Sequence, residues 1–405
     1  MNVRRERIYL DHNASAPLLP EAREAAVAAL DLGNPSSTHR EGRAARAACE
    51  NARASVARLI GGAGGSIPAE NVVFTSGATE AATQLLSPHW LIGGQAVEIA
   101  RVAVLETDHP ATREGGRFAA EAVTRLPVDQ NGVIDLGALA AFAEAAAKAG
   151  PAMLAISWAN SETGVIQPVE AIRAVLEERR GDHSVVLVLD AAQTAGRIAV
   201  DLAATGADAL ILSGHKMGAA KGVGAIALRT LATRPFTLLR GGGQERGMRA
   251  GTEALPAIAS FGAAAEVCFA RGTDTVARLS AMRERLEEEL TRRLPQAMIL
   301  GKGAERLPNT VAMVHPGVKA ETAQIALDLA GIAVSAGSAC SSGKVGPSHV
   351  VAALAKAGLD VDQALGAIRV SFGLETDEGA LDRFVCEYER LACRAAVKTR
   401  SAAAA

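Results

Sequence analysis

Between about residue 70 and residue 230, short apolar runs rich in Val, Ile and Leu alternate with segments of helical length. The runs do not alternate apolar with polar residues, so both faces of each predicted strand are expected to be buried. This pattern is typical of a mostly parallel sheet covered by helices on both faces. The predicted strands are Asn71–Phe74, Val102–Leu105, Met153–Trp158, Val185–Leu189, Ala209–Leu212 and Ala225–Leu228; the helices between them include Glu114–Val123, Leu136–Ala149 and Val169–Arg179.

The segments that flank this region predict a second, smaller unit. Two helices, Pro20–Leu30 and Glu41–Ile60, precede the sheet, and a charge-rich helix at Arg278–Leu294 follows it. Further strands are predicted near Thr310–Val314, Ile332–Ser335 and Ile368–Phe372. A length of 405 residues allows two domains. We expect an α/β fold with a large domain over residues 15–255, a smaller α+β domain made of 1–14 and 256–400, and a frayed tail at 401–405.

The composition indicates an ordinary globular protein in the cytoplasm. The formal net charge is -2, which gives no reason to expect nucleic acid as a partner. Charge or glycine breaks every apolar stretch before it could span a membrane, and the first residues lack a signal-peptide core.

The five cysteines show neither a CxxC pair nor zinc-ligand spacing. Cys49, Cys268, Cys386 and Cys393 lie in helix-like contexts and are expected to be small packing residues. Cys340 differs, because the loop of small residues around it has little capacity to bury a thiol.

Lys216 follows the predicted strand Ala209–Leu212 directly, in the stretch Ser213-Gly214-His215-Lys216. An amine desolvated at the end of a buried strand has a lowered pKa and becomes nucleophilic, as Schiff-base chemistry with a carbonyl cofactor requires. A lysine in this position can equally be a solvated loop residue, so the interpretation depends on the rest of a pyridoxal phosphate site.

Other strand ends carry side chains that suit the ring of that cofactor. Asp190 ends a strand, where its carboxylate could pair with a protonated pyridine nitrogen. Gln193 and Asn160 could donate to the phenolic oxygen, and His109 could stack on the ring. The alternatives are a helix-capping aspartate, a solvated glutamine, an Asx turn at Asn160 and a structural histidine.

A second group of residues suits a phosphate. The segment Phe74–Glu80 follows a strand and opens a helix, so that N–H groups near Ala78 and Thr79 would face an anion. Ser213 and His215 add donors on the neighbouring strand end. A plain helix N-cap explains the same segment equally well.

Arg369 lies inside an apolar strand pattern, where its guanidinium must be paired. A substrate carboxylate would fit its planar fork, and a buried structural ion pair is the alternative. The glycine-rich segment Arg240–Thr252 is either a flexible surface loop or a segment that closes over a site.

Together these segments resemble the cysteine desulfurases of the class V pyridoxal phosphate-dependent aminotransferase family, in its nitrogenase-associated and housekeeping iron–sulfur group. The resemblance runs in family order from residue 9 to about residue 373. The matching segments are Tyr9–Ala14, Gly33–His39, Thr75–Glu80, Asn160, Asp190–Gln193, Ser213–Lys216, Gly241–Thr252, Gly337–Ser342 and Arg369–Ser371.

The resemblance implies the fold of type I pyridoxal phosphate enzymes and a role for each matching residue. Lys216 would bind the cofactor aldehyde and move the substrate Cα proton, and Cys340 would take the substrate sulfur as a persulfide. The other implied contacts are Ala78, Thr79, Ser213, Gly214 and His215 for the phosphate, Thr252 for the phosphate of the neighbouring subunit, Asp190, Asn160, Gln193 and His109 for the ring, and Arg369 and Asn34 for the substrate.

The resemblance also implies L-cysteine as the substrate, a homodimer, and an iron–sulfur scaffold or sulfur carrier as the acceptor. The sulfur on Cys340 would transiently ligate iron in a cluster shared with that partner. The sequence leaves open a selenocysteine lyase or small-substrate aminotransferase on the same fold, and a degenerate paralogue that acts as a scaffold. It also leaves open whether the sulfur serves nitrogenase, housekeeping clusters or tRNA thiolation.

Overall fold

A computed structural model describes residues 7–62, 65, 67–179, 185–337 and 348–403. Within them, seven strands form a central sheet in the order β2-β10-β9-β8-β7-β5-β6. These strands are β2 (Val72–Thr75), β5 (Arg101–Leu105), β6 (Val123–Leu126), β7 (Ala152–Ser157), β8 (Val185–Asp190), β9 (Ala209–Ser213) and β10 (Gly224–Leu228). β10 is antiparallel to both of its neighbours, and the other pairs are parallel.

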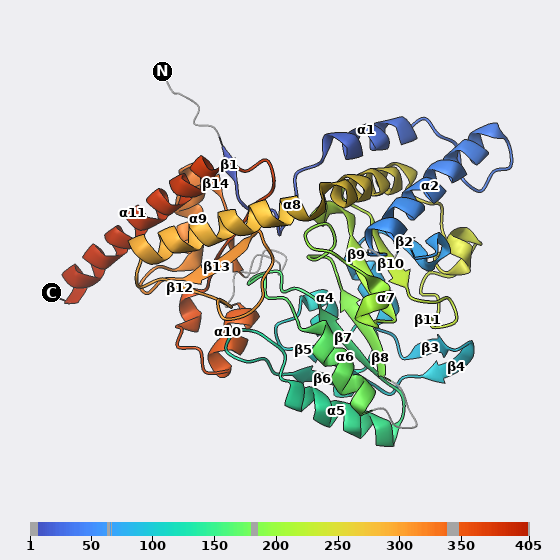
Figure 1. The fold of residues 1–405 in the computed structure, drawn as a ribbon, viewed down its shortest axis with the longest axis horizontal. Helices are drawn as coiled ribbons and strands as arrows, with labels where there is room; N and C mark the ends of the chain where they lie inside the picture. Colours follow the sequence, from blue (N-terminus) through green and yellow to red (C-terminus); the bar gives the residue numbers. More distant parts are fainter. Residues whose placement is uncertain (1–6, 63–64, 66, 180–184, 338–347, 404–405) are drawn as a thin grey trace.

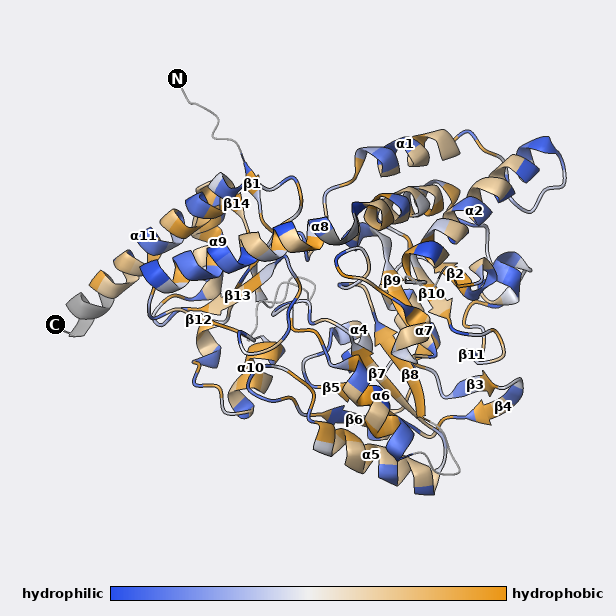
Figure 2. Cartoon of the chain, viewed as in Figure 1, coloured by the Kyte–Doolittle hydropathy of each residue, from blue (hydrophilic) through white to orange (hydrophobic). Residues whose placement is uncertain are grey.

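Both faces of the sheet are buried, which confirms the expectation drawn from the unalternating strands. In β7, Leu154 and Ile156 belong to one core cluster and Met153 and Ala155 to another. The first cluster includes apolar residues of α2 (Arg40–Leu59), α5 (Leu136–Ala149), α6 (Val169–Glu178) and α7 (Leu202–Thr205). The second includes residues of α3 (Ala78–Leu85). In Figure 2 the central strands are correspondingly orange, and the helices around them carry both colours.

A second sheet lies beside the first and holds the C-terminal part of the chain (Figure 1). Its order is β12-β13-β16-β15, with antiparallel pairing throughout. These strands are β12 (Met298–Ile299), β13 (Thr310–Val314), β15 (Ser335–Ala336) and β16 (Ile368–Ser371). The helices α9 (Ala320–Leu329) and α11 (Glu378–Ala403) flank it, and α10 (His349–Lys356) packs into the core of the larger sheet.

The long helix α8 (Leu255–Arg293) connects the two parts of the molecule (Figure 1). Its first half contributes Phe261 and Ala265 to the core that includes α2, and α1 (Pro20–Ala29) also packs against α8. Its second half contributes Leu286 and Leu290 to the core of the second sheet. The change occurs at Gly272, whose φ of 62° and ψ of -166° interrupt the helix. The limits of the two domains stay a prediction.

Several local expectations are wrong. The α-helix expected at Glu114–Val123 does not form, because Gly115 and Gly116 adopt positive φ angles of 75° and 59° and end the short α4 (Pro110–Arg113). Only a 3-10 turn at Ala120–Ala122 remains, and Val123 begins β6, which the sequence did not predict. The strand expected at Ile332–Ser335 is divided between two sheets, since β14 (Ile332–Ala333) pairs with β1 (Ile8–Tyr9) and Ser335 pairs with Arg369.

Two further expectations need correction near the end of the chain. The tail expected to fray at 401–405 is helical through Ala403, and the last two residues lie outside the described part. Cys49 and Cys268 are buried as packing residues should be, whereas Cys393 is exposed on α11.

A small sheet was not expected at all. It has the order β11-β3-β4, formed by β11 (Arg234–Pro235), β3 (His89–Ile92) and β4 (Gln95–Glu98). Among the residues that the structure describes, no helix is both long and apolar enough to cross a bilayer.

Candidate active site

The candidate residues gather at the carboxyl edge of the central sheet. Because β2, β5, β7, β8 and β9 run in the same direction, their carboxyl ends meet there, where ligands bind in open α/β sheets. β9 ends at Ser213 and is followed by the turn that carries Lys216. The neighbouring strand β8 ends at Asp190, which pairs with Ile211. The sheet therefore brings Asp190 and Lys216 to the same edge.

The amine of Lys216 is held by the N-terminal segment. Its Nζ donates to the carbonyl oxygens of Asn13 at 2.5 Å and Ala14 at 2.9 Å. These residues follow β1, which belongs to the other part of the molecule. The buried Oδ1 of Asn13 has no hydrogen-bond partner among the described residues, so it is a polar group that a bound molecule could satisfy.

Asp190 is a buried carboxyl with positive charge beside it. Burial raises its pKa, while the N–H of Ala192, at 3.0 Å, and the neighbouring His109 and Lys216 side chains oppose that rise. A carboxyl in such a place needs a cationic partner to stay ionised. A protonated pyridine nitrogen is a partner of that kind, so the donor set fits the cofactor ring.

A second buried carboxyl, Asp108, lies next to this site and was missed by sequence reasoning. Burial raises its pKa to about 7, and the negative charge of Asp190 adds to that effect. Its oxygens accept from the N–H groups of Ser157 at 2.8 Å and Leu105 at 2.7 Å. The signal available in the sequence was an acid directly before His109, just past a strand.

His109 begins α4, and its Nδ1 accepts from the N–H of Ala111 at 3.1 Å. A ring nitrogen that accepts carries no proton, so the proton of this neutral imidazole lies on Nε2. A neutral ring is compatible with stacking on the cofactor. His109 also caps the start of α4, which is the structural role that the sequence left open as the alternative.

The two amide side chains are already engaged by the protein. Asn160 Oδ1 accepts from the N–H groups of Glu162 and Thr163, each at 2.9 Å, which is the Asx turn considered above. Its Nδ2 donates to Thr107 O at 2.8 Å and has a second N–H that could reach a ligand. Gln193 Nε2 donates to Asn13 O at 3.2 Å.

The segment predicted to hold the phosphate lies where β2 turns into α3. Gly77 precedes the helix, and Gly224 of β10 approaches it so closely that a Cβ on Gly224 would lie 2.7 Å from the Gly77 carbonyl carbon. The first N–H groups of a helix have no partner within the helix and attract anions. Ala78 and Thr79 stand at this terminus, and α3 packs against β9, which ends at Ser213.

His215 lies beside Lys216 and is uncharged at neutral pH. Burial lowers its pKa to about 4, with repulsion from Lys216, Lys221 and Arg197 in the same direction. Its Nδ1 lies 3.3 Å from Ser15 Oγ. A neutral imidazole can still donate one N–H to a phosphate oxygen.

Arg369 is buried on β16 with 1% of its surface exposed. Its Nη2 forms an ion pair with Asp11 Oδ1 at 2.7 Å, and its Nη1 donates to Ser161 O at 2.9 Å. This is the structural ion pair of the alternative interpretation, and Asp11 was missed as its partner. The Nε of Arg369 has no partner among the described residues, so one edge of the fork stays available to a carboxylate.

Three predicted residues are not brought into this cluster by any described contact. Asn34 is exposed in the loop between α1 and α2, where its Oδ1 accepts from Ser36 N at 2.8 Å. Thr252 is exposed at the end of the glycine-rich segment. Cys340 lies outside the described residues.

The described residues on either side of 338–347 are held against the segment that follows β7. Ser348 Oγ donates to Glu162 Oε2 at 2.6 Å, and a Cβ on Gly337 would lie 2.5 Å from the same oxygen. Gly337 N donates to Ala367 O at 2.8 Å. His349 Nε2 lies 2.9 Å from the backbone oxygen of Asp108. Gly337, Ser348 and His349, which flank residues 338–347, therefore lie close to the segment of Asn160 and to Asp108.

Comparison with known proteins assigns this arrangement to a family. Residues 8–384 match the class-V aminotransferase family. The chain is a member of that family. It is 40% identical to a cysteine desulfurase of Cereibacter sphaeroides over 94% of both chains. It is 33% identical to the cysteine desulfurase IscS of Dictyoglomus turgidum over 96% of this chain and 95% of that one.

Solved structures agree with these relatives. A NifS-like protein superposes with a TM-score of 0.82 at 28% identity, covering 95% of this chain and 99% of the other. The NifS-like protein from Rickettsia africae gives 0.81 at 26% identity, with the same coverage. The resemblance inferred from the sequence is confirmed, as are the type I fold and the cofactor, pyridoxal 5'-phosphate.

Proposed function

We propose that this class-V family member is an L-cysteine desulfurase, which converts L-cysteine to L-alanine and keeps the sulfur as a persulfide on Cys340. The main support is that the carboxyl edge of the sheet brings Lys216 and the buried carboxyl of Asp190 together, close enough for the charge of Lys216 to act on Asp190. The similar proteins of Cereibacter sphaeroides and Dictyoglomus turgidum, both cysteine desulfurases, support the same activity.

The cofactor supplies an electron sink that makes the Cα proton and the C–S bond of a bound amino acid labile. Asp190 keeps a negative charge beside the ring nitrogen, and Ala78, Thr79, Ser213, Gly214 and His215 hold the phosphate. Asn160 and Gln193 would hold the ring through its phenolic oxygen, and His109 would stack on it. Lys216 would bind the cofactor aldehyde, and its amine would move the proton at Cα.

The chain's own thiol completes the reaction. Arg369 holds the substrate carboxylate, with Asn34 as a further substrate contact. The Cys340 thiolate then attacks the substrate sulfur, so that an S–S bond forms as the C–S bond breaks. The carbon left behind takes up a proton and leaves as alanine. A thiolate near a cationic site is a reactive form of cysteine.

The acceptor of the persulfide is an iron–sulfur scaffold or a sulfur carrier in the cytoplasm, and nitrogenase clusters are one destination. The sulfur on Cys340 would meet iron at that stage, in a cluster shared with the partner. Co-purification with a scaffold protein would support this destination.

The activity is tested by incubating the holoenzyme with L-cysteine and a reducing thiol, and measuring alanine and sulfide. Stoichiometric alanine and sulfide are expected, with loss of both in Cys340→Ala. Cys393→Ala is the matched control, because Cys393 is exposed on α11, and it should keep full activity. A Cys340→Ala variant as active as the parent would reject the persulfide mechanism.

A second measurement separates an enzyme from a scaffold paralogue. The holoenzyme should show a visible absorbance band from the lysine–cofactor bond, and Lys216→Ala should lose that band. Lack of any band after reconstitution with pyridoxal phosphate would favour the scaffold.

A further inference from the structure

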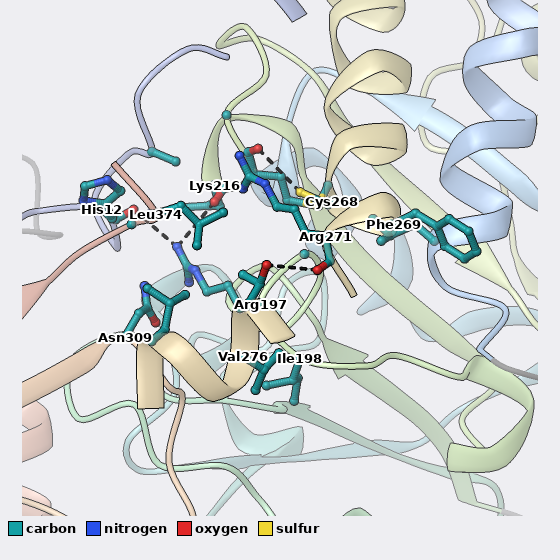
Figure 3. A pocket seen from close by; sticks show the side chains of 18 of the residues that line it. His12, Arg197, Ile198, Lys216, Cys268, Phe269, Arg271, Val276, Asn309 and Leu374 are labelled. Carbon is teal, nitrogen blue, oxygen red and sulfur yellow. Dashed lines mark hydrogen bonds between the residues drawn. The ribbon is translucent and has the colours of Figure 1, made fainter. Parts of the chain in front are cut away.

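A cavity of about 470 Å³ lies beneath the kink of α8, between the two parts of the molecule (Figure 3). Segment 12–19, the turn after Gln193 and the residues around Gly272 enclose it. Much of its wall is apolar, formed by Leu19, Leu59, Ile198, Val276, Leu279 and Phe372. The volume is that of a pocket for a small organic molecule.

This cavity is distinct from the candidate active site. Of the residues assigned to cofactor or substrate, only Lys216 contributes to the described lining. The carbonyl oxygen of Lys216 lies on this side, 3.4 Å from Arg197 Nη2, whereas its amine bonds to Asn13 and Ala14. The wall between the two spaces is thus the backbone of Lys216 and the N-terminal segment.

The charges in the cavity are not balanced. Arg197 Nη1 donates to the backbone oxygen of Gln193 at 3.0 Å and to its side-chain Oε1, and Nη2 donates to the backbone oxygens of His12 at 3.3 Å and Lys216 at 3.4 Å. Within the described residues, no carboxylate forms an ion pair with Arg197 or with Arg271, which also lines the cavity (Figure 3). Burial, followed by repulsion from Arg369, lowers the pKa of Arg197 to about 10.

Glu375, the acid among the described residues that line the cavity, does not balance the charge of the two arginines. Its Oε1 lies 3.4 Å from His12 Nε2, and that contact lowers the pKa of Glu375 to about 2, with a smaller contribution from Arg271. Glu375 is also half-exposed at the rim. Two guanidinium groups therefore face an apolar space with one carboxylate, which is already engaged by an imidazole.

We propose that this cavity binds a small organic carboxylate with an unbranched apolar tail. The carboxylate would lie between Arg197 and Arg271. Both terminal nitrogens of Arg197 already donate to protein oxygens, so Arg197 would act through its charge, and the planar fork of Arg271 would match the two carboxylate oxygens. The tail would lie against Ile198, Val276 and Leu279. The ligand would thus satisfy the charge of the arginines and cover the apolar wall in one step.

Isothermal titration of the holoenzyme with sodium octanoate tests the site. One saturable event per chain is expected. Arg271→Ala should weaken binding about tenfold, the loss typical of a charge-assisted hydrogen bond. Val276→Trp should abolish binding by filling the cavity. Arg278→Ala is the matched control, because Arg278 is exposed on the same helix and outside the cavity, so its affinity should equal that of the parent.

Two outcomes would overturn the proposal: no saturable heat with octanoate, or parental affinity in both Arg271→Ala and Val276→Trp. Octylamine carries the same tail with the opposite charge and should not bind, and equal affinity for it would also reject an anion site. Melting curves of each variant report folding separately. Binding is measured without L-cysteine, so the two proposals are tested separately. A protein that is an active desulfurase but does not bind octanoate would contradict only the cavity proposal. A protein that binds octanoate but has no desulfurase activity would contradict only the proposed function.

Discussion

At the scale of single residues, burial sets the protonation states of the candidate site. Burial raises the pKa of Asp108 and Asp190 and lowers that of His215. The positive charge of Lys216 opposes the effect of burial and favours the ionised form of Asp190. Charge at this site therefore depends on neighbours that come from different strand ends.

Replacing Asp190 by Asn tests the charge without a large change in shape. The amide oxygen can still accept from Ala192, so the variant should fold, but it carries no negative charge for the ring nitrogen. We expect kcat for alanine formation to fall roughly 100-fold. Asp274→Asn, an exposed change on α8, should leave kcat unaltered. Near-parental kcat in Asp190→Asn would show that the carboxylate does not serve the cofactor.

His215 predicts a pH dependence of stability in the cofactor-free protein. Its pKa is about 4 when folded, against an ordinary value of 6.5, so the unfolded chain binds more protons between these values. The free energy of unfolding should therefore fall as the pH drops from 6.5 towards 4. After allowance for solvent screening, His215 should contribute a loss of about 1 kcal/mol between pH 7 and pH 5.

Urea unfolding at both pH values measures this contribution, with His215→Gln as the comparison. The variant should lose less stability than the parent over the same interval, by about that amount. An identical loss in both proteins would mean that His215 titrates normally when folded.

At the scale of elements, the glycine-rich segment is anchored rather than free. Glu245 receives two hydrogen bonds from Arg53 of α2, at 2.6 Å and 2.9 Å, and one from Phe74 N of β2 at 2.8 Å. Arg249 pairs with Glu80 of α3 at 2.9 Å. The segment is thereby joined to the strand and helix that are proposed to hold the phosphate, and the flexible-loop interpretation does not hold for its described contacts.

Breaking the Arg53–Glu245 pair should be costly, because both side chains are buried. Glu245→Gln removes the buried counter-charge of Arg53 and leaves only Glu50, which is half-exposed at 3.3 Å from Nε, so we expect a loss of about 3 kcal/mol in the free energy of unfolding. Arg246→Ala is the control. Arg246 is the next residue and has the same left-handed backbone conformation as Glu245. Its ion pair with Glu50 is exposed, so the loss of this pair should lower the free energy of unfolding by less than about 1 kcal/mol. Similar losses in the two variants would refute the distinction.

At the scale of the whole molecule, the proposed homodimer would place Thr252 at the phosphate of the neighbouring subunit. Thr252 is exposed, and Phe236 and Leu239 near the same segment expose 36% and 40% of their surface. Apolar side chains around an exposed polar group are consistent with a subunit interface.

Mixed dimers test this arrangement. Lys216→Ala and Thr252→Ala chains, each impaired alone, should regain activity when co-expressed, because a mixed dimer contains one site with both residues intact. Light scattering of the purified protein should give the mass of a dimer. No recovery in mixed dimers of confirmed composition would place Thr252 outside the partner's site.

The sequence by itself determined every strand of the central sheet except β6, and the strand ends that carry Lys216, Asp190 and His109. It could do so because burial on both faces leaves a local apolar pattern, and a polar residue after such a run marks the strand's end. The predicted bounds of the helix Leu136–Ala149 also agree with those of α5, which Asp135 caps at its start and Gly150 at its end.

Only the tertiary structure decided which distant groups meet. The carbonyls that hold Lys216, the Asp11 partner of Arg369 and the cavity around Arg197 each join residues more than a hundred positions apart or from different elements. The helix expected at Glu114–Val123 failed for a related reason, since the backbone of Gly115 and Gly116 is set by close packing against Val123 and Leu86. Contacts of this kind leave no periodic trace in the chain, because they depend on how the elements pack.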